Sequence, residues 1–231
     1  MKTIGLIGGM SWESTKSYYE LLNQGVKQRL GGLHSAKILL HSVDFAPIES
    51  MQQQGEWEEA GAFLANIALG LQDAKADMIA LCTNTMHKVA PAIVNHLRIP
   101  FVHIAESTAK ALKKDHKRHA ILLGTRFTMQ EDFYTSILTR HEIRTSIPCK
   151  QTCEKINDII FNELCLGIYN ESSKRYFLDV IHQLYSDDKS IDSVILGCTE
   201  IGLLIAQKDS FLPFFDTTIL HVNDVLEHAF S

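Results

Sequence analysis

The sequence predicts an α/β protein built from two similar domains, each with a parallel sheet flanked by helices. Short apolar runs rich in β-branched residues alternate with longer segments of helical period, which is typical of parallel strands joined by helices. Matching residues recur at one constant offset in the two halves of the chain. The 231 residues are also enough for two modest domains that each bury a core.

The apolar runs predict strands at residues 3–7, 37–43, 78–81, 101–104, 120–123, 193–196 and 213–215. Between them, helical spacing of apolar residues predicts helices at 13–30, 57–74, 88–97, 107–114, 129–140, 155–164, 174–185 and 217–229. Ser11 or Ser14 is expected to cap the first helix, and Asp216 or Thr217 the last, because their oxygens accept bonds from unpaired helix amides. Pro47 indicates a turn.

The composition excludes several classes of protein. Hydrophobic residues make up 45% and charged residues 21%, as in ordinary globular proteins, so disorder and low complexity are excluded. There are 22 basic and 27 acidic residues with no basic block, and we therefore expect no nucleic-acid partner. No apolar stretch approaches the roughly 20 residues that span a bilayer, so no membrane span is expected. Five unevenly spread cysteines favour reduced thiols and a cytoplasmic location over a disulfide framework.

The recurring offset is 116 residues, the difference between the positions of Cys198 and Cys82. Matched residues lie at equivalent places in the predicted elements, such as a Gly that ends a strand and a Tyr inside the next helix. This agreement favours an internal duplication. The other matched pairs are Gly8 with Gly124, Tyr18 with Tyr134, Leu22 with Leu138, Ile79 with Ile195, Thr83 with Thr199, and Ala90 with Ala206.

Both Cys-Thr pairs follow an apolar run and precede a predicted helix. In open α/β sheets, ligands bind at this carboxyl end of the strands. A helix N-terminus also favours thiolate over thiol, so we expect a lowered pKa for Cys82 and Cys198. Two domains related by a pseudo-two-fold axis would bring the two thiols to opposite sides of an interdomain cleft, where we expect the active site.

Two such groups suit the inversion of a carbon centre. One base removes a proton from one face while an acid returns a proton to the other, and a cysteine pKa can be tuned near neutrality for either task. A single cysteine at a strand end is more often a structural residue. The repeat-related pair, each member followed by a hydroxyl, favours the catalytic interpretation.

Four motifs stand out in the sequence: residues 8–15 (GGMSWEST), 81–88 (LCTNTMHK), 124–129 (GTRFTM) and 197–201 (GCTEI). Together they resemble the aspartate/glutamate racemase superfamily, on its aspartate racemase and broad-specificity amino-acid racemase side. The resemblance covers essentially the whole chain, with the motifs in family order. It implies a cofactor-independent racemase that uses two bases, with two pseudo-symmetric α/β domains and a homodimeric assembly.

The resemblance implies a first domain of residues 1–106 plus 212–231 and a second of residues 107–211. It makes Cys82 and Cys198 the acid/base pair, acting on a small amino-acid substrate. Backbone amides and hydroxyls would hold the substrate carboxylate, while Glu200 would pair with its ammonium group. The implied substrate-binding residues are Met10, Ser11, Gln52, Asn84, Thr85, Thr125, Thr128, Thr199 and Glu200.

This chain departs from the glutamate racemase pattern at two places. Thr83 stands between Cys82 and Asn84, and Glu200 rather than His follows the second Cys-Thr pair. The first departure leaves open whether Cys82 or Thr83 faces the α-carbon. Because a threonine hydroxyl is a far poorer base than a thiol, Cys82 is the preferred candidate.

The substrate is expected to be aspartate, glutamate or a broader set of amino acids. The residues that follow Leu166-Gly167 lack the lysine that aspartate racemases can use for the side-chain carboxylate. Two alternatives remain: another carbon-acid isomerase or decarboxylase of the same superfamily, or a non-catalytic small-molecule binding protein. The eleven histidines show no zinc-site spacing, so no metal is expected.

Overall fold

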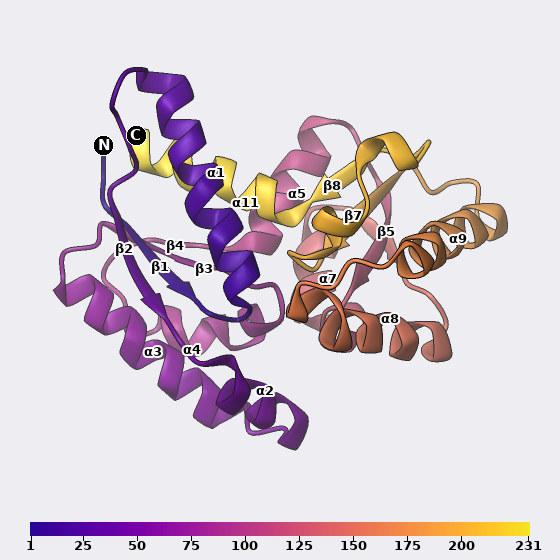
Figure 1. Ribbon diagram of the computed structural model, residues 1–231, viewed down its shortest axis with the longest axis horizontal. Coiled ribbons are helices and arrows are strands. Elements are labelled where there is room, and N and C mark those ends of the chain that lie inside the picture. Colours follow the sequence, from indigo (N-terminus) through magenta and orange to yellow (C-terminus); the bar gives the residue numbers. More distant parts are fainter. The chain divides into compact units, whose positions relative to one another are not determined.

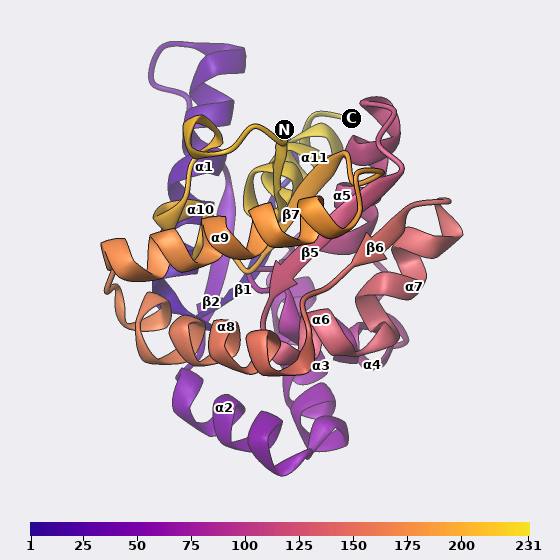
Figure 2. The same ribbon diagram turned by 90° about the vertical axis from the view of Figure 1, so that its right-hand side faces the viewer.

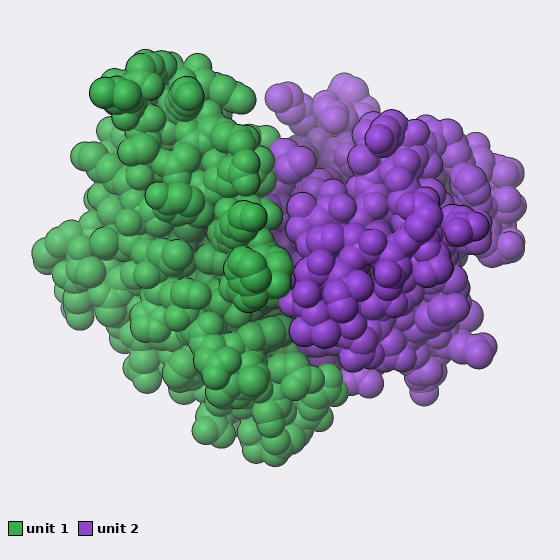
Figure 3. Space-filling view, in the orientation of Figure 1, with its two compact units in different colours: residues 1–104, 221–231 green, residues 105–220 purple.

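The computed structural model describes all residues from Met1 to Ser231, and the chain forms two compact units. Unit 1 comprises residues 1–104 and 221–231, and unit 2 comprises residues 105–220 (Figure 3). Each unit contains one four-stranded sheet in which every paired strand is parallel to its neighbour. The predicted α/β class with helix-flanked parallel sheets is therefore confirmed. None of the helices combines the length and the apolar character that a membrane crossing requires.

The sheet of unit 1 has the strand order β2-β1-β3-β4. The central strands β1 and β3 are buried along their whole length, which is why they read as unbroken apolar runs. The strands are β1 (Ile4–Gly8), β2 (Ile38–Ser42), β3 (Met78–Leu81) and β4 (Phe101–Val102).

Helices cover both faces of this sheet (Figure 1). One face packs against α3 and the other against α1 and α11, so that unit 1 has two separate apolar cores. The helical elements are α1 (Trp12–Leu30), α2 (Phe45–Gln54), α3 (Trp57–Asp73), the short η1 (Thr85–Val89), α4 (Ala90–Val94) and α11 (Thr217–Phe230).

The sheet of unit 2 has the corresponding order β6-β5-β7-β8. Helices α8 and α9 lie across one face of it (Figure 2) and bury a large apolar core there. The strands are β5 (His119–Gly124), β6 (Arg144–Ser146), β7 (Ser193–Gly197) and β8 (Phe214–Asp216). The helical elements are α5 (Ile104–Lys114), α6 (Arg126–Gln130), α7 (Asp132–Arg140), α8 (Lys150–Asn162), η2 (Leu164–Leu166), α9 (Glu171–Asp187), α10 (Ile201–Leu204) and η3 (Gln207–Asp209).

Helix α2 and strand β6 were not predicted from the sequence, nor were the short α10 and η3. The turn expected at Pro47 is the first turn of α2, where a proline is tolerated because its missing N–H would be unpaired anyway. Asp44 caps this helix by accepting a bond from the Ala46 amide at 3.3 Å. The edge strand β6 reads Arg-Thr-Ser and is partly exposed, so it has no apolar run by which to be found.

The division of the chain differs from the expected one near its C-terminus. The family resemblance places the residues from 212 onward in the first domain, but β8 pairs in register with β7 of the second sheet. The chain returns to unit 1 only after Leu220, within α11. The preceding crossing follows Ile104, close to the expected position.

Candidate active site

Most of the candidate site residues follow the carboxyl ends of strands, and the two Cys-Thr pairs lie there as predicted. In unit 1 these are Met10 and Ser11 after β1, Gln52 in the helix after β2, and Cys82, Thr83, Asn84 and Thr85 after β3. In unit 2 they are Thr125 and Thr128 after β5, and Cys198, Thr199 and Glu200 after β7. All of these side chains are buried. Within each unit, polar groups therefore gather at the end of the sheet where α/β proteins bind ligands.

Cys82 does not belong to this polar group. Its side chain is 0% exposed and lies in the apolar core between the sheet and helices α1 and α11, with Tyr18, Leu22 and Val222. Burial raises the pKa of the Cys82 thiol. The expected lowering of this pKa is wrong because the loss of hydration outweighs any effect of the short helix that follows.

Strand register shows which residue of unit 1 corresponds to Cys198. In unit 1, Ile7 of β1 is paired with Leu81 of β3. In unit 2, the matching Leu123 of β5 is paired with Leu196 of β7. Counting two residues onward from each partner leads to Thr83 in unit 1 and Cys198 in unit 2. The two side chains are each 7% exposed. Thr83, not Cys82, therefore occupies the position equivalent to Cys198.

The offset of 116 residues concealed this correspondence. It aligns Cys82 with Cys198, but the strand pairs require a shift of one residue at this point. A one-residue shift moves a side chain to the opposite face of a sheet. The structural counterpart of Cys82 is Gly197, where a Cβ atom would lie 2.8 Å from the Leu123 carbonyl oxygen.

Cys198 forms a hydrogen-bonded group with the two residues that follow it. Its thiol donates to Glu200 Oε2 at 3.0 Å, and the Thr199 hydroxyl donates to the same oxygen at 2.7 Å. Glu200 is only 2% exposed. Burial and then the negative charge of Glu200 raise the pKa of Cys198 well above its usual value, so its expected lowering is also wrong. The Cys198 thiol therefore holds its proton more tightly than a free cysteine and directs it towards Glu200 Oε2.

Thr83 lies in a tight turn at the end of β3. Its amide donates to the Leu81 carbonyl oxygen at 2.9 Å, and its own carbonyl oxygen lies 2.7 Å from Nδ1 of His87. The hydroxyl is the only polar group on this side chain, and it replaces the thiol that Cys198 supplies in unit 2. The two equivalent positions are therefore chemically unequal.

Hydroxyl groups at the start of α1 hold the turn after β1 in place. Ser11 caps the helix by accepting a bond from the Ser14 amide at 3.2 Å. Thr15 Oγ1 accepts a bond from the Gly9 amide at 2.7 Å, and Ser14 Oγ donates to the Cys82 carbonyl oxygen at 2.9 Å. Sequence analysis did not assign Ser14 and Thr15 to the site, although the run Ser-Trp-Glu-Ser-Thr signals hydroxyls at a helix start.

Gln52 brings a buried amide to the same end of the unit 1 sheet. Its Nε2 atom donates to Met86 Sδ at 2.9 Å, while Oε1 is buried and has no hydrogen-bond partner. A buried acceptor without a partner costs free energy. It is therefore suited to receive an N–H group of a ligand. In unit 2, Thr125 caps α6 by accepting from the Thr128 amide at 3.3 Å.

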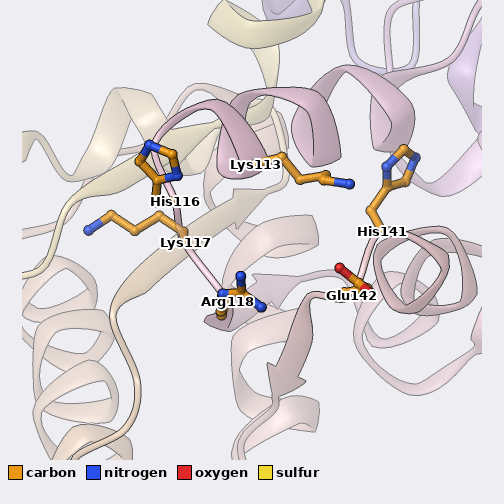
Figure 4. A pocket seen from close by; sticks show the side chains of 6 residues that line it. All are labelled: Lys113, His116, Lys117, Arg118, His141 and Glu142. Carbon is orange, nitrogen blue, oxygen red and sulfur yellow. The ribbon is translucent and has the colours of Figure 1, made fainter.

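A separate cavity of about 150 Å³ in unit 2 contains none of these residues. Figure 4 shows side chains that line it, among them Lys113, Arg118, His141 and Glu142, with the Lys117 ammonium group directed away from Glu142. It lies where α5 and α7 end and before β5 begins. Cations at these positions offset the negative ends of helix dipoles, which explains the basic lining without a ligand.

Two α/β units with buried polar side chains at the carboxyl ends of their strands are typical of proteins that bind small molecules there. The family model described as Asp/Glu/Hydantoin racemase matches residues 7–225. The chain belongs to this family, whose named members are isomerases. No group of three or more His, Cys, Asp or Glu side chains is arranged to hold a metal ion.

The similarity of this chain to individual proteins is consistent with its family membership. The chain is 22% identical over 219 residues to the broad-specificity amino-acid racemase RacX of Bacillus subtilis, covering 93% of this chain and 92% of that protein. A crystal structure of a Yersinia pestis protein assigned to the Asp/Glu racemases is 46% identical and covers 100% of both chains, with a TM-score of 0.91. An aspartate racemase homologue from Pyrococcus horikoshii is 32% identical and covers 100% of both chains, with a TM-score of 0.86.

Proposed function

We propose that this protein is a cofactor-independent amino-acid racemase in which Cys198 and Thr83 exchange protons with opposite faces of one substrate α-carbon. The substrate is aspartate, glutamate or a wider set of amino acids. The observation that carries this proposal is the equivalence of the two positions in strand register. Family membership supports the reaction class, and the burial of Cys82 in an apolar core argues for Thr83 as its replacement.

The proton transfers follow from the chemistry of the two side chains. Glu200 first takes the proton of the Cys198 thiol, with which it is already hydrogen-bonded. The thiolate then takes the α-proton, so that the Cα–H bond breaks and its electron pair remains on the carbon. The Thr83 hydroxyl protonates the carbanion on the other face. The resulting alkoxide takes a proton from water, and the proton held by Glu200 neutralises the hydroxide that forms, so that all three side chains return to their starting states. The reverse sequence inverts the other enantiomer.

The carbanion has no electron sink in such a reaction, so fixed donors must stabilise it. We propose that the groups at the strand ends serve this purpose, with Asn84, Thr85 and Thr199 holding the substrate carboxylate. The unpaired Oε1 of Gln52 accepts a bond from the substrate ammonium. Glu200 is bonded to Cys198 and Thr199, and this favours a role in activating the thiol over the ammonium pairing first expected.

Solvent exchange at the α-carbon tests this proposal. Single enantiomers of acidic and neutral amino acids are incubated in D₂O without added cofactor, then analysed by chiral chromatography and mass spectrometry. The wild-type protein should invert at least one amino acid and label its product. Thr83→Val, which keeps the shape of the side chain, should stop inversion but still label the one enantiomer whose α-proton faces Cys198.

Cys198→Ala should stop inversion of both enantiomers and stop labelling of the enantiomer whose α-proton faces Cys198, because no thiolate then reaches that proton. A wild-type protein that binds amino acids but neither labels nor inverts them would instead be a binding protein. Rapid inversion by Thr83→Val would exclude Thr83 as the second acid/base group.

A further inference from the structure

His87 contacts the backbone of Thr83, the candidate acid/base residue of unit 1. It is 1% exposed and belongs to η1, four residues after Thr83. Its Nδ1 atom is 2.7 Å from the Thr83 carbonyl oxygen, and its Nε2 atom is 3.2 Å from the backbone nitrogen of Ile104. The imidazole thus connects the end of β3 with the segment that follows β4.

These two partners determine where the proton of the imidazole lies. A carbonyl oxygen can only accept a hydrogen bond, so Nδ1 carries the proton and donates it to Thr83. The Ile104 amide can only donate, so Nε2 is unprotonated and accepts. His87 is therefore neutral, in the Nδ1–H form. Burial, and then the nearby His103 and His221, lower its pKa well below the usual value, which agrees with this neutral form.

We propose that His87 is a positioning residue for the racemase reaction, holding the Thr83 backbone, and hence the Thr83 hydroxyl, in place through its Nδ1–H bond. This inference rests on the proposed function. Thr83 lies beyond the last residue of β3 that is paired with β1, so its position depends on such bonds. Displacing a reacting group by about 1 Å can reduce a rate roughly a hundredfold.

His221 provides an internal comparison within the same cluster of rings. It is fully buried, and its ring centroid is 5.8 Å from that of His87. Its Nε2–H group donates to the Val102 carbonyl oxygen at 2.8 Å, so its Nδ1 atom accepts from the Tyr18 hydroxyl at 2.8 Å. It resembles His87 in burial and in the number of its bonds, but these bonds do not involve Thr83.

Two substitutions of His87 each remove one of its two hydrogen bonds and keep the other. The amide nitrogen of asparagine is as far from the backbone as Nδ1, so His87→Asn retains a donor for Thr83 and loses the partner of Ile104. The longer glutamine reaches the position of Nε2, so His87→Gln retains an acceptor for Ile104 and loses the Thr83 bond. Both remove the same buried ring and should be destabilised to a similar extent.

The experiment measures kcat and KM for racemisation by both variants and by His221→Gln, together with their unfolding in urea. We expect His87→Gln to lose roughly ten- to a hundredfold in kcat, with KM within about threefold of wild type. His87→Asn and His221→Gln should keep kcat within about threefold, despite similar losses of stability. Equal kcat values for His87→Asn and His87→Gln would overturn the inference.

A second measurement does not depend on activity. NMR of ¹⁵N-labelled wild-type protein should show the Nδ1–H tautomer at His87, and the Thr83 carbonyl ¹³C shift should change more in His87→Gln than in His87→Asn. An Nε2–H tautomer, or equal shifts in the two variants, would contradict the inference. If the wild-type protein shows no racemase activity while these NMR results hold, the proposed function fails but the placement of Thr83 by His87 stands.

Discussion

The Cys198 thiol donates a hydrogen bond to Glu200 Oε2 at 3.0 Å, and both side chains are buried. The charge of Glu200 contributes to the raised pKa of Cys198. We therefore expect Glu200→Gln to lower the thiol pKa, because a neutral amide no longer opposes ionisation. The pH dependence of iodoacetamide alkylation measures this, in a Cys149→Ala background because Cys149 is exposed. The alkylation that is lost in a Cys198→Ala variant identifies the part of the signal that comes from Cys198.

The same substitution should slow racemisation. Without the Glu200 carboxylate, the Cys198 proton has no adjacent base to receive it, and loss of such a base costs roughly a hundredfold or more in rate. We expect kcat for Glu200→Gln to fall by about this factor at neutral pH. A lower thiol pKa combined with undiminished kcat would show that the carboxylate does not activate Cys198.

Cys82 and Thr83 are adjacent, but substitution of Cys82 should reduce stability while substitution of Thr83 should reduce activity. Cys82→Ala removes a sulfur atom from an apolar core, so we expect a loss of about 1–2 kcal/mol in the free energy of unfolding and a kcat close to wild type. Thr83→Val should remain folded and lose racemisation, while Thr83→Ser should retain part of it. Urea denaturation and chiral chromatography give the two readouts. An inactive but folded Cys82→Ala variant would restore Cys82 as a candidate.

Acid should destabilise the protein through its buried histidines. Burial lowers the pKa of His221 to about 4, below the value near 6.5 in an unfolded chain. The contribution of neutral His221 to stability is complete above pH 6.5. It is lost as the pH falls from 6.5 towards 4, because only the unfolded chain then takes up the proton. Between pH 7.5 and pH 4.5 we expect a loss of about 2–3 kcal/mol from this residue.

His221→Gln provides the control for this pH dependence because glutamine does not titrate. Its free energy of unfolding should change less between the two pH values than that of the wild type, by the same 2–3 kcal/mol. His87 acts in the same direction, since its pKa is also lowered, and its contribution remains in both proteins. Identical pH dependence in wild type and variant would show that His221 is not held in the neutral form.

Replacing either of two glycines of unit 1 by alanine should change the stability of the protein, in opposite directions for the two positions. Gly9 has φ of 96°, and a Cβ atom there would lie 2.1 Å from the Val43 carbonyl oxygen. Gly9→Ala should destabilise the protein by about 1–3 kcal/mol. Gly70 is an exposed position of α3 with no neighbour within 4 Å of a Cβ atom. Gly70→Ala should stabilise the protein by up to about 1 kcal/mol. Thermal unfolding of the two variants tests both expectations.

Much of the fold was predictable because it depends on local patterns. Fully buried strands such as β1, β3 and β7 appear as short apolar runs, and the apolar stripe of α1 follows helical spacing. Elements without such a pattern were missed. The edge strand β6 is polar, and α2 contains a proline in its first turn. The polar residues after the strands were likewise recognisable, because ligand groups follow parallel strands at their carboxyl ends.

The choice between Cys82 and Thr83 was decided only by the tertiary structure. The sequence by itself determined that two similar halves each end a buried strand with Cys-Thr. It contains no local signal for the register between β1 and β3, which lie more than 70 residues apart in the chain. Register is set by hydrogen bonds and packing between distant segments, and a shift of one residue exchanges the two faces of a strand. The same long-range packing joins His87 to Ile104 and so decides what supports Thr83.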